Sequence, residues 1–273
     1  MKKIICNILL VFFACTFFFS LYKIIELKSE YDSGTDSYAS LDAFVSIPEP
    51  TRPPATEPVA TVPQASEGAD SPSLPPIPVR PEKPGIQWPV IDFEALAEIN
   101  PDVVAWIYIP GTNINYPVVQ GRDNDHYLYY MFDGGYNRAG CLFLDTNVAK
   151  DFSASNSVIH GHNLMNGAMF AGLVEYQNQA FYQEHPSALL MTPEGNYEIA
   201  FFSAYHTDVS SSAWDSMFTQ EDYILWQSEI SEKSCFETDL YPMSDDRIVT
   251  LSTCSYEFSN ARFVVHGILI PEE

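Results

Sequence analysis

The chain divides into three stretches with different hydrophobic patterns. Residues Ile4 to Tyr22 form a 19-residue run that is almost wholly apolar, and residues 31 to 87 carry few large apolar side chains. After them, short apolar runs alternate with turn residues. A 19-residue helix is about 28 Å long, close to the hydrocarbon thickness of a bilayer. The pattern predicts a membrane anchor, a linker and one folded domain.

The anchor is predicted within residues 1 to 30. A cleaved signal peptide is the alternative, but its apolar region is shorter and ends in a small-x-small site, which residues 19 to 22 lack. Lys2 and Lys3 precede the apolar run, so the positive-inside rule places the amino terminus in the cytoplasm, although Lys23 and Lys28 weaken the asymmetry. We therefore expect a single-pass protein of the cell membrane with its folded domain outside.

Residues 31 to 87 are predicted to form an extracytoplasmic linker rich in Pro, Ser and Thr. Thirteen of the 20 prolines lie between Pro48 and Pro89. This composition cannot bury enough apolar surface to offset the entropy of ordering. Because polyproline II rises by ~3.1 Å per residue, we interpret the linker as a semi-rigid spacer. Residues 88 to 273 are expected to fold without it.

The folded domain is predicted to be mainly β. Eight short runs are rich in aromatic and β-branched residues and are bounded by turn residues. They are 106–109, 116–119, 140–144, 157–160, 188–192, 197–205, 247–254 and 262–270. Eight strands without regular intervening helices predict a closed eight-stranded β-barrel. Helices are predicted at its amino-terminal end, over 93–99 with Asp92 as N-cap, and between late strands, over 216–236.

The charge is strongly acidic. The formal net charge is −23, and from Pro89 onward 26 acidic residues face six basic ones. This charge argues strongly against nucleic acid as a partner, because phosphate binding needs a basic surface. A cationic partner such as an amine or a basic peptide suits this surface better, although the acidity would equally serve solubility. No C-x-x-C spacing supports a structural zinc site.

Three cysteines lie beyond the anchor, and one of them is a candidate nucleophile. Cys141 belongs to an apolar run and is interpreted as core, whereas Cys254 ends the 247–254 strand and Arg262 opens the next. If these strands pair, the two Cβ atoms lie roughly 5 Å apart. A guanidinium there favours the thiolate or stabilises an oxyanion. The alternative is a buried cysteine beside a surface arginine. Cys235 completes an odd count, which leaves a free thiol or an intermolecular bridge.

A thiol enzyme also needs a proton carrier. His160 and His162 flank Gly161 at the end of the 157–160 strand. His162 could project over the barrel rim, and His160 could be a core or ladder residue instead. Their spacing alone does not choose between them. Both precede Cys254, whereas in a papain-like hydrolase the cysteine comes first, which counts against that class.

Several motifs together resemble the sortases, the membrane-anchored cysteine transpeptidases of Gram-positive bacteria. The run TLSTC at 250–254, followed by Arg262, resembles their active-site signature, and Gly161-His162-Asn163 is similar to their histidine segment. The runs NYPVVQ at 115–120, DN at 123–124, YL at 127–128 and FLD at 143–145 match the pattern of class B sortases. The motifs occur in the expected order and cover about residues 93 to 269.

The resemblance implies roles for individual residues. Cys254 would be the nucleophile, His162 the general acid and base, and Arg262 the group that binds the substrate carbonyl and the developing oxyanion. His160 occupies a position where the family often has tyrosine.

The substrate groove is also implied by the resemblance. Ser252, Asn124 and Leu128 match positions that line the sorting-signal groove in class B members. Because nothing in the sequence resembles an EF-hand loop or another metal cage, we expect neither a metal nor another cofactor.

The resemblance implies a cysteine transpeptidase. It would cleave a C-terminal sorting signal on secreted proteins after Thr and join the new carboxyl end, through a thioacyl-enzyme, to an amine of a peptidoglycan stem or cross-bridge peptide. Its other partner would be the membrane, through the amino-terminal helix. Two alternatives remain open: a pilus-assembling sortase that uses a pilin lysine, and a catalytically silent surface-binding barrel.

Overall fold

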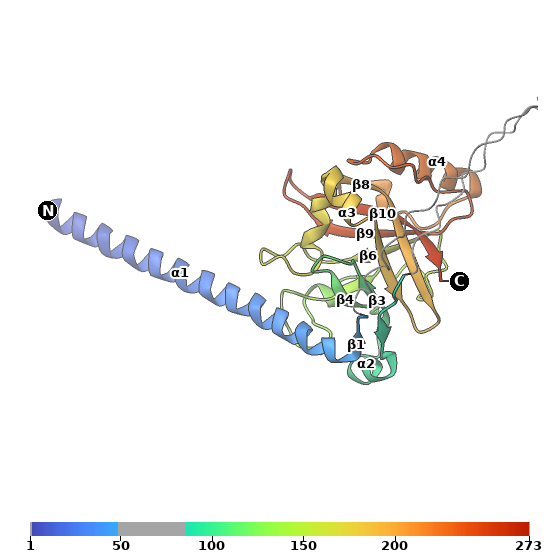
Figure 1. The fold of residues 1–273 in the computed structure, drawn as a ribbon. Coiled ribbons are helices and arrows are strands. Elements are labelled where there is room, and N and C mark those ends of the chain that lie inside the picture. Colours follow the sequence, from blue (N-terminus) through green and yellow to red (C-terminus); the bar gives the residue numbers. More distant parts are fainter. Residues whose placement is uncertain (1, 49–85, 273) are drawn as a thin grey trace, which may run out of the picture.

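A computed structural model describes residues 2–48 and 86–272 of the chain. A long amino-terminal helix projects away from a β-barrel that has short helices on its surface (Figure 1). Most of the predicted linker, residues 49 to 85, lies outside the described residues.

The barrel has eight strands and is closed, as the sequence predicts. The strands are β3 (Val103–Tyr108), β4 (Asn115–Val119), β5 (Leu142–Leu144), β6 (Asn156–His160), β7 (Ser187–Met191), β8 (Asn196–Asp208), β9 (Ile248–Cys254) and β10 (Ala261–Pro271). Their order around the barrel is β10-β8-β7-β3-β4-β5-β6-β9. The β4–β5 and β6–β9 pairs are parallel and the other pairs are antiparallel.

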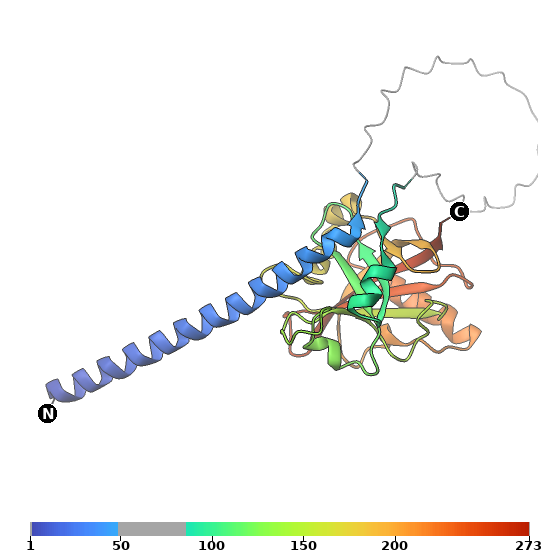
Figure 2. The same ribbon diagram turned by 90° about the horizontal axis from the view of Figure 1, so that it is seen from below.

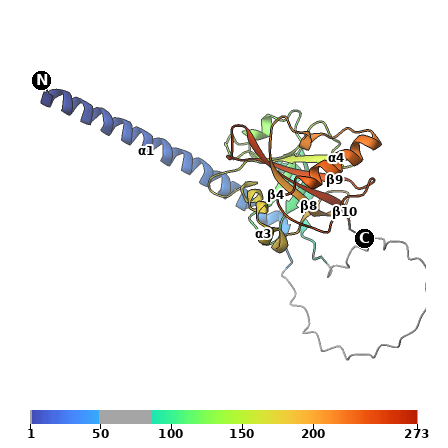
Figure 3. The same ribbon diagram turned by 90° about the horizontal axis from the view of Figure 1, so that it is seen from above.

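Strand β9 is buried on both faces because both faces are covered. Val249 and Leu251 of β9 belong to the main core, whereas Ile248 belongs to a second cluster. This second cluster lies under α4 (Gln220–Glu232), whose Tyr223 and Trp226 pack on it. Figure 3 shows α4 over β8, β9 and β10. Helix α4 is the predicted inserted helix, and it covers this side of the barrel as a second layer.

The remaining helices of the barrel domain are short. Helix α2 (Phe93–Ile99) begins where predicted, with the Asp92 carboxylate accepting a hydrogen bond from Ala95 N at 2.9 Å. Helix α3 (Gln179–Glu184) follows the 3₁₀ helix η3 (Ala171–Gln177). Three further 3₁₀ turns are η1 (Leu41–Phe44), η2 (His126–Leu128) and η4 (Ser212–Trp214). Two of them, η2 and η4, lie beside the site described below.

Helix α1 (Lys2–Ser40) contains the predicted anchor. Among the described residues, one helical stretch is long and apolar enough to cross a membrane, and the most apolar 18-residue window within it has a mean hydropathy of 1.8 and none of its residues buried. A signal sequence would meet the same criterion, so the single-pass topology stays a prediction.

The structure differs from the prediction at the start of the linker. Helix α1 continues through Tyr31 to Ser40, and its final turns lie against the barrel (Figure 2). Tyr38 and Leu41 are buried in the main core. Gly34, Tyr38 and Leu41 follow helical spacing and give this polar segment one narrow packing face. The segment thus packs as part of the folded unit. That residues 88 to 273 fold without it stays a prediction.

Candidate active site

One pocket of about 280 Å³ contains every candidate site residue of the sequence analysis. These residues are Asn124, Leu128, His162, Ser252, Cys254 and Arg262. Residues that the sequence analysis did not name as site residues also line the pocket, among them Asp145 and Trp214.

Cys254 and Arg262 lie directly opposite each other in the β9–β10 ladder. This confirms the pairing that the sequence predicts. Cys254 is partly exposed, whereas the six preceding residues of β9 are buried, because the strand ends at the pocket. The Arg262 guanidinium donates from Nη1 to Ala261 O at 3.0 Å. Within residues 2–48 and 86–272, no carboxylate forms an ion pair with Arg262, so further N–H donors remain for a ligand.

The segment around His162 is fastened to β9. Strand β6 runs parallel to β9. The residues that follow β6 also form hydrogen bonds with β9. Gly161 N donates to Ser252 O at 3.0 Å, and Thr253 Oγ1 donates to Gly161 O at 2.8 Å. Asn163 Nδ2 donates to Cys254 O at 2.8 Å. His162 therefore lies between two residues that are bonded to the end of the β9 strand.

Glycine at position 161 is required by packing. A Cβ atom there would overlap the Leu142 side chain and lie 2.7 Å from the Phe170 ring. The close approach lets the histidine segment follow the barrel wall instead of bulging from it.

The His162 ring is oriented by one hydrogen bond. Its Nε2 lies 2.8 Å from Leu128 O. A carbonyl oxygen can only accept, so Nε2 carries the hydrogen, and in the neutral ring Nδ1 is left as a proton acceptor. Leu128 thus contributes its backbone as well as a lining side chain.

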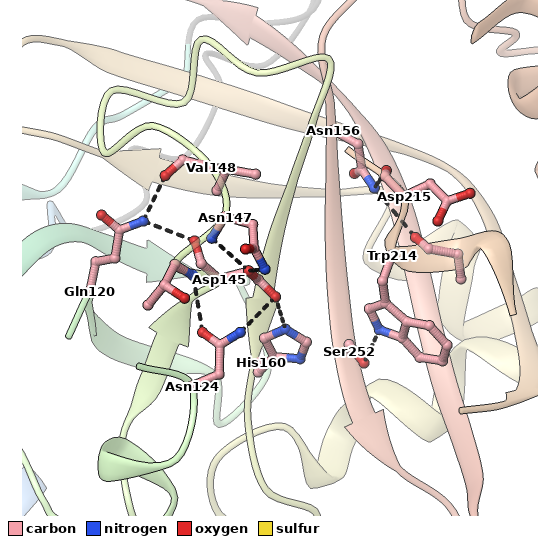
Figure 4. A network of polar contacts seen from close by, with 12 residues as sticks. Gln120, Asn124, Asp145, Asn147, Val148, Asn156, His160, Trp214, Asp215 and Ser252 are labelled. Carbon is pink, nitrogen blue, oxygen red and sulfur yellow. Dashed lines mark hydrogen bonds and ion pairs between the residues drawn. The ribbon is translucent and has the colours of Figure 1, made fainter. Parts of the chain in front are cut away.

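Asp145, which also lines the pocket, lies at the centre of a polar network (Figure 4). One carboxylate oxygen accepts from His160 Nε2 at 3.2 Å and from Asn124 Nδ2 at 3.0 Å. The other accepts from Asn147 N at 2.8 Å and from Asn147 Nδ2 at 2.7 Å. Burial alone would raise the pKa of Asp145, but these hydrogen bonds outweigh it and hold that pKa well below its ordinary value. The carboxylate therefore stays ionised and fixes the His160 ring.

The predicted groove residues have partners within the chain. The Asn124 amide donates to Asp145, and its oxygen accepts from Thr146 N at 3.0 Å, so its hydrogen bonds hold the wall. Ser252 Oγ accepts from Trp214 Nε1 at 2.9 Å (Figure 4). Trp214 comes from η4, in the β8–α4 connection. No sequence pattern pointed to it, whereas Asp145 belongs to a run that the resemblance already contained.

Comparisons with known proteins agree with this geometry. A family model described as the sortase domain matches residues 107–270. The chain belongs to the sortase family. Sortase B of Staphylococcus aureus is 36% identical over 182 residues, which are 65% of this chain and 74% of the relative. Sortase B of Listeria monocytogenes is 33% identical over 185 residues, 66% and 74% of the two chains. The structure titled a Staphylococcus aureus sortase B–substrate complex has a TM-score of 0.63 at 34% identity and covers 66% of this chain and 85% of that chain.

These relatives confirm the class as well as the family. The chain is a class B sortase, and sortases are cysteine transpeptidases, so the protein is an enzyme of acyl transfer. The stretch that the sortase model matches lies within the barrel domain and contains all six candidate residues, whereas helix α1 lies outside it.

Proposed function

We propose that Cys254, His162 and Arg262 perform the transpeptidation. The observation that supports this most directly is the cross-strand pair of Cys254 and Arg262, with His162 in the same pocket. Cys141, in the barrel core, is fully buried, and burial raises the pKa of its thiol to about 12. Such a thiol is a poor nucleophile at neutral pH.

In the first half-reaction, the Cys254 thiolate attacks the scissile carbonyl carbon. The carbonyl oxygen becomes an oxyanion, which the Arg262 guanidinium stabilises. When the intermediate collapses, the C–N bond breaks and the protonated His162 ring gives its Nδ1 proton to the leaving amine. The product is a thioester on Cys254 and a neutral His162.

In the second half-reaction, an amine attacks the thioester carbonyl. His162 Nδ1 takes the proton from the attacking nitrogen, a new amide forms, and the Cys254 thiolate leaves. The His162 ring returns to its protonated form. Because Nε2 stays bonded to Leu128 O, both proton transfers use the same nitrogen without a ring flip.

The substrates that we propose are a sorting signal cleaved after Thr and an amine of a cell-wall peptide. One Staphylococcus aureus neighbour is a sortase B–substrate complex, and another neighbour is a sortase B complexed with triglycine, a peptide with a free amine. The acidic barrel domain suits a cationic acceptor. Ser252, Asn124 and Leu128 would line the groove for the sorting signal, Asn124 chiefly by holding the wall.

The cellular setting that we propose is the outer face of the cell membrane. Helix α1 would be the single-pass anchor, with the amino terminus in the cytoplasm and the barrel outside. The secreted proteins that carry a sorting signal and the peptidoglycan amines are both found there.

Mass spectrometry tests this function. The full-length protein is incubated with threonine-containing pentapeptides and candidate amines, and the protein is mapped for a covalent adduct. We expect an acyl adduct on Cys254 with one peptide class and its loss when the right amine is added. A pilin-lysine peptide as the preferred acceptor would indicate pilus assembly. Tight peptide binding without any adduct would indicate a silent binding barrel.

A further inference from the structure

The end of helix α1 docks on two loops of the barrel. We call residues 30 to 41 the docked segment, and the loops are the 133–141 loop and the 163–169 loop. Side-chain hydrogen bonds join them: Ser37 Oγ to Asp133 at 2.9 Å, Asn137 Nδ2 to Glu30 O at 2.8 Å, Tyr38 OH to Gly140 O at 2.6 Å, and Asn166 Nδ2 to Thr35 Oγ1 at 3.1 Å. Both loops adjoin residues of the active-site pocket.

The docked segment is shaped for close approach. Gly34 is buried near the end of helix α1, and a Cβ atom there would lie 3.0 Å from Ala139 Cβ. Glycine costs an exposed helix about 1 kcal/mol relative to alanine, and here it lets the helix backbone touch the 133–141 loop. Tyr38, one turn later, is only 7% exposed. Ala39, beside it, is exposed to solvent.

The first connection runs from the docked segment to the His162 side chain. Tyr38 OH lies 3.0 Å from Cys141 Sγ, and Cys141 N donates to Tyr127 O at 2.8 Å. The next residue, Leu128, supplies the carbonyl that holds His162 Nε2. Tyr38 therefore contacts the residue whose backbone N–H bonds to η2, and η2 supplies the carbonyl that orients the imidazole.

The second connection runs from the docked segment to the His162 backbone. The Tyr38 and Tyr116 rings pack edge to face with centroids 5.4 Å apart. Tyr116 OH accepts from Met169 N at 3.3 Å, and the next residue, Phe170, donates from N to His162 O at 2.9 Å. The ring and the main chain of His162 thus depend on Tyr38 through different contacts.

The chain leaves the folded domain after the docked segment and returns to it at the same place. Strand β1 (Val45–Ser46) pairs with β2 (Val90–Ile91), and Asp92 N donates to Phe44 O at 3.0 Å. The 43 residues between these strands begin and end side by side. They therefore add no distance between helix α1 and the barrel, contrary to the spacer interpretation. Such a tether keeps the docked segment at a high effective concentration beside its loops.

We propose that the docked segment is a positioning element of the active site, acting on His162 through Tyr38. The proposal rests on the proposed proton-transfer role of His162. The segment lies outside residues 107–270, the stretch that the sortase model matches. Contacts alone do not establish coupling between two places, so the test perturbs the docked segment and measures the chemistry.

The test compares two leucine substitutions in the full-length chain in phospholipid nanodiscs. Gly34→Leu raises helix propensity but places a side chain against Ala139, so it should displace the docked segment. Ala39→Leu is the matched control because its side chain faces solvent. Tyr38→Ala is a second perturbation that removes both connections. The rate of Cys141 alkylation, mapped by mass spectrometry, reports undocking because Cys141 is fully buried beside Tyr38.

We expect Gly34→Leu and Tyr38→Ala to raise Cys141 alkylation and to lower kcat for peptide cleavage by about 10- to 100-fold, the scale of a catalytic group misplaced by roughly 1 Å. The KM should change by less than about threefold, because Ser252 and Asn124 of the sorting-signal groove lie on neither connection and Leu128 enters the first one only through its backbone carbonyl. The pH profile of kcat should change because the His162 ring is displaced. Ala39→Leu should match the wild type. Increased alkylation with unchanged kcat overturns the proposal, and so does wild-type alkylation in both variants.

A deletion separates the docked segment from the residues that follow it. Deleting 50–84 keeps β1 and β2 joined by a short connection, and we expect wild-type kcat. The same deletion combined with Tyr38→Ala should show the kcat loss of Tyr38→Ala alone. Equal activity of the deletion with and without Tyr38→Ala would contradict the proposal. If the wild type itself forms no Cys254 adduct, the proposed function fails, and Cys141 alkylation still reports whether the segment docks.

Discussion

The two walls of the pocket differ in how fully the chain satisfies their polar groups. On the β5 side, Asp145 accepts four hydrogen bonds and His160 is tied to it. On the β9–β10 side, His162 and Arg262 have one side-chain hydrogen bond each within the described part of the chain, both to backbone carbonyls. Cys254, which is partly exposed, lies opposite Arg262 in the ladder and lines the same pocket as His162.

This difference distinguishes the wall that holds the structure of the pocket from the wall that we expect to carry out the reaction. A polar group with all its partners supplied by the chain has a fixed position and a fixed proton. A group that keeps donors or acceptors available can exchange protons or bind developing charge. We therefore expect the β5 wall to keep the shape of the pocket and the residues of the β9–β10 wall to take part in the reaction. The predictions below test each side of this contrast.

The largest expected effect is at the nucleophile. Cys254→Ala should abolish peptide cleavage and the acyl adduct, because no other thiol lines the pocket among the described residues. Cys141→Ala and Cys235→Ala should keep activity largely intact. Peptide cleavage followed by mass spectrometry measures all three. Turnover by Cys254→Ala would show that Cys254 is not the nucleophile.

The next largest effect is a difference in kcat between substitutions of His162 and His160. His162→Ala removes the proton carrier and should lower kcat toward the upper end of the about 10²- to 10⁴-fold range of general acid–base catalysis. His160→Phe keeps a ring against Phe143 and loses only the Asp145 contact, so it should stay at least partly active. Steady-state kinetics of both variants decides this, and the opposite ranking would reverse our assignment of scaffold and chemistry.

Arg262→Lys should cost about 10²- to 10³-fold in kcat, or roughly 2.7 to 4 kcal/mol, although it keeps the charge. Arginine presents a planar fork that can hold Ala261 O and an oxyanion together, whereas lysine offers one mobile ammonium. The control is Arg122→Lys on the exposed surface, which should be silent. A near-wild-type rate for Arg262→Lys would reduce the arginine to a diffuse electrostatic role.

The sequence was sufficient for the features that depend on neighbours along the chain. The β9–β10 pair is joined by a short loop, so alternation and loop length placed Cys254 opposite Arg262 before the fold was known. The eight strands were recognisable because each contains a run rich in apolar and β-branched residues that is bounded by turn residues.

Features that depend on distant segments could not be predicted in this way. The Asp145–His160 contact needs β5 and β6 to pair, and the Trp214–Ser252 bond needs the β8–α4 connection to fold over β9. The docked end of α1 was hidden by its polar composition. The only indication in the sequence was the helical spacing of Gly34, Tyr38 and Leu41. That spacing can be interpreted only when the barrel surface against which these residues pack is known.

The smallest expected effect is at the satisfied wall and concerns stability. Asp145→Asn should lower the free energy of unfolding at pH 7 by about 1–3 kcal/mol, since it weakens hydrogen bonds to a charged group, and should change kcat by less than about tenfold. Asp125→Asn, on the exposed surface, is the matched control and should change stability by less than about 0.5 kcal/mol.

The pH dependence of that effect follows from the lowered pKa of Asp145. The folded state favours the carboxylate, so below the unfolded pKa of about 3.9 the unfolded state binds more protons. The stabilisation is complete above that pKa and is lost as the pH falls through the folded pKa. Denaturant unfolding of wild type and Asp145→Asn should therefore show a gap at pH 7 that narrows at pH 3. A gap that is constant with pH would mean that Asp145 stabilises the wall by shape and not by its charge.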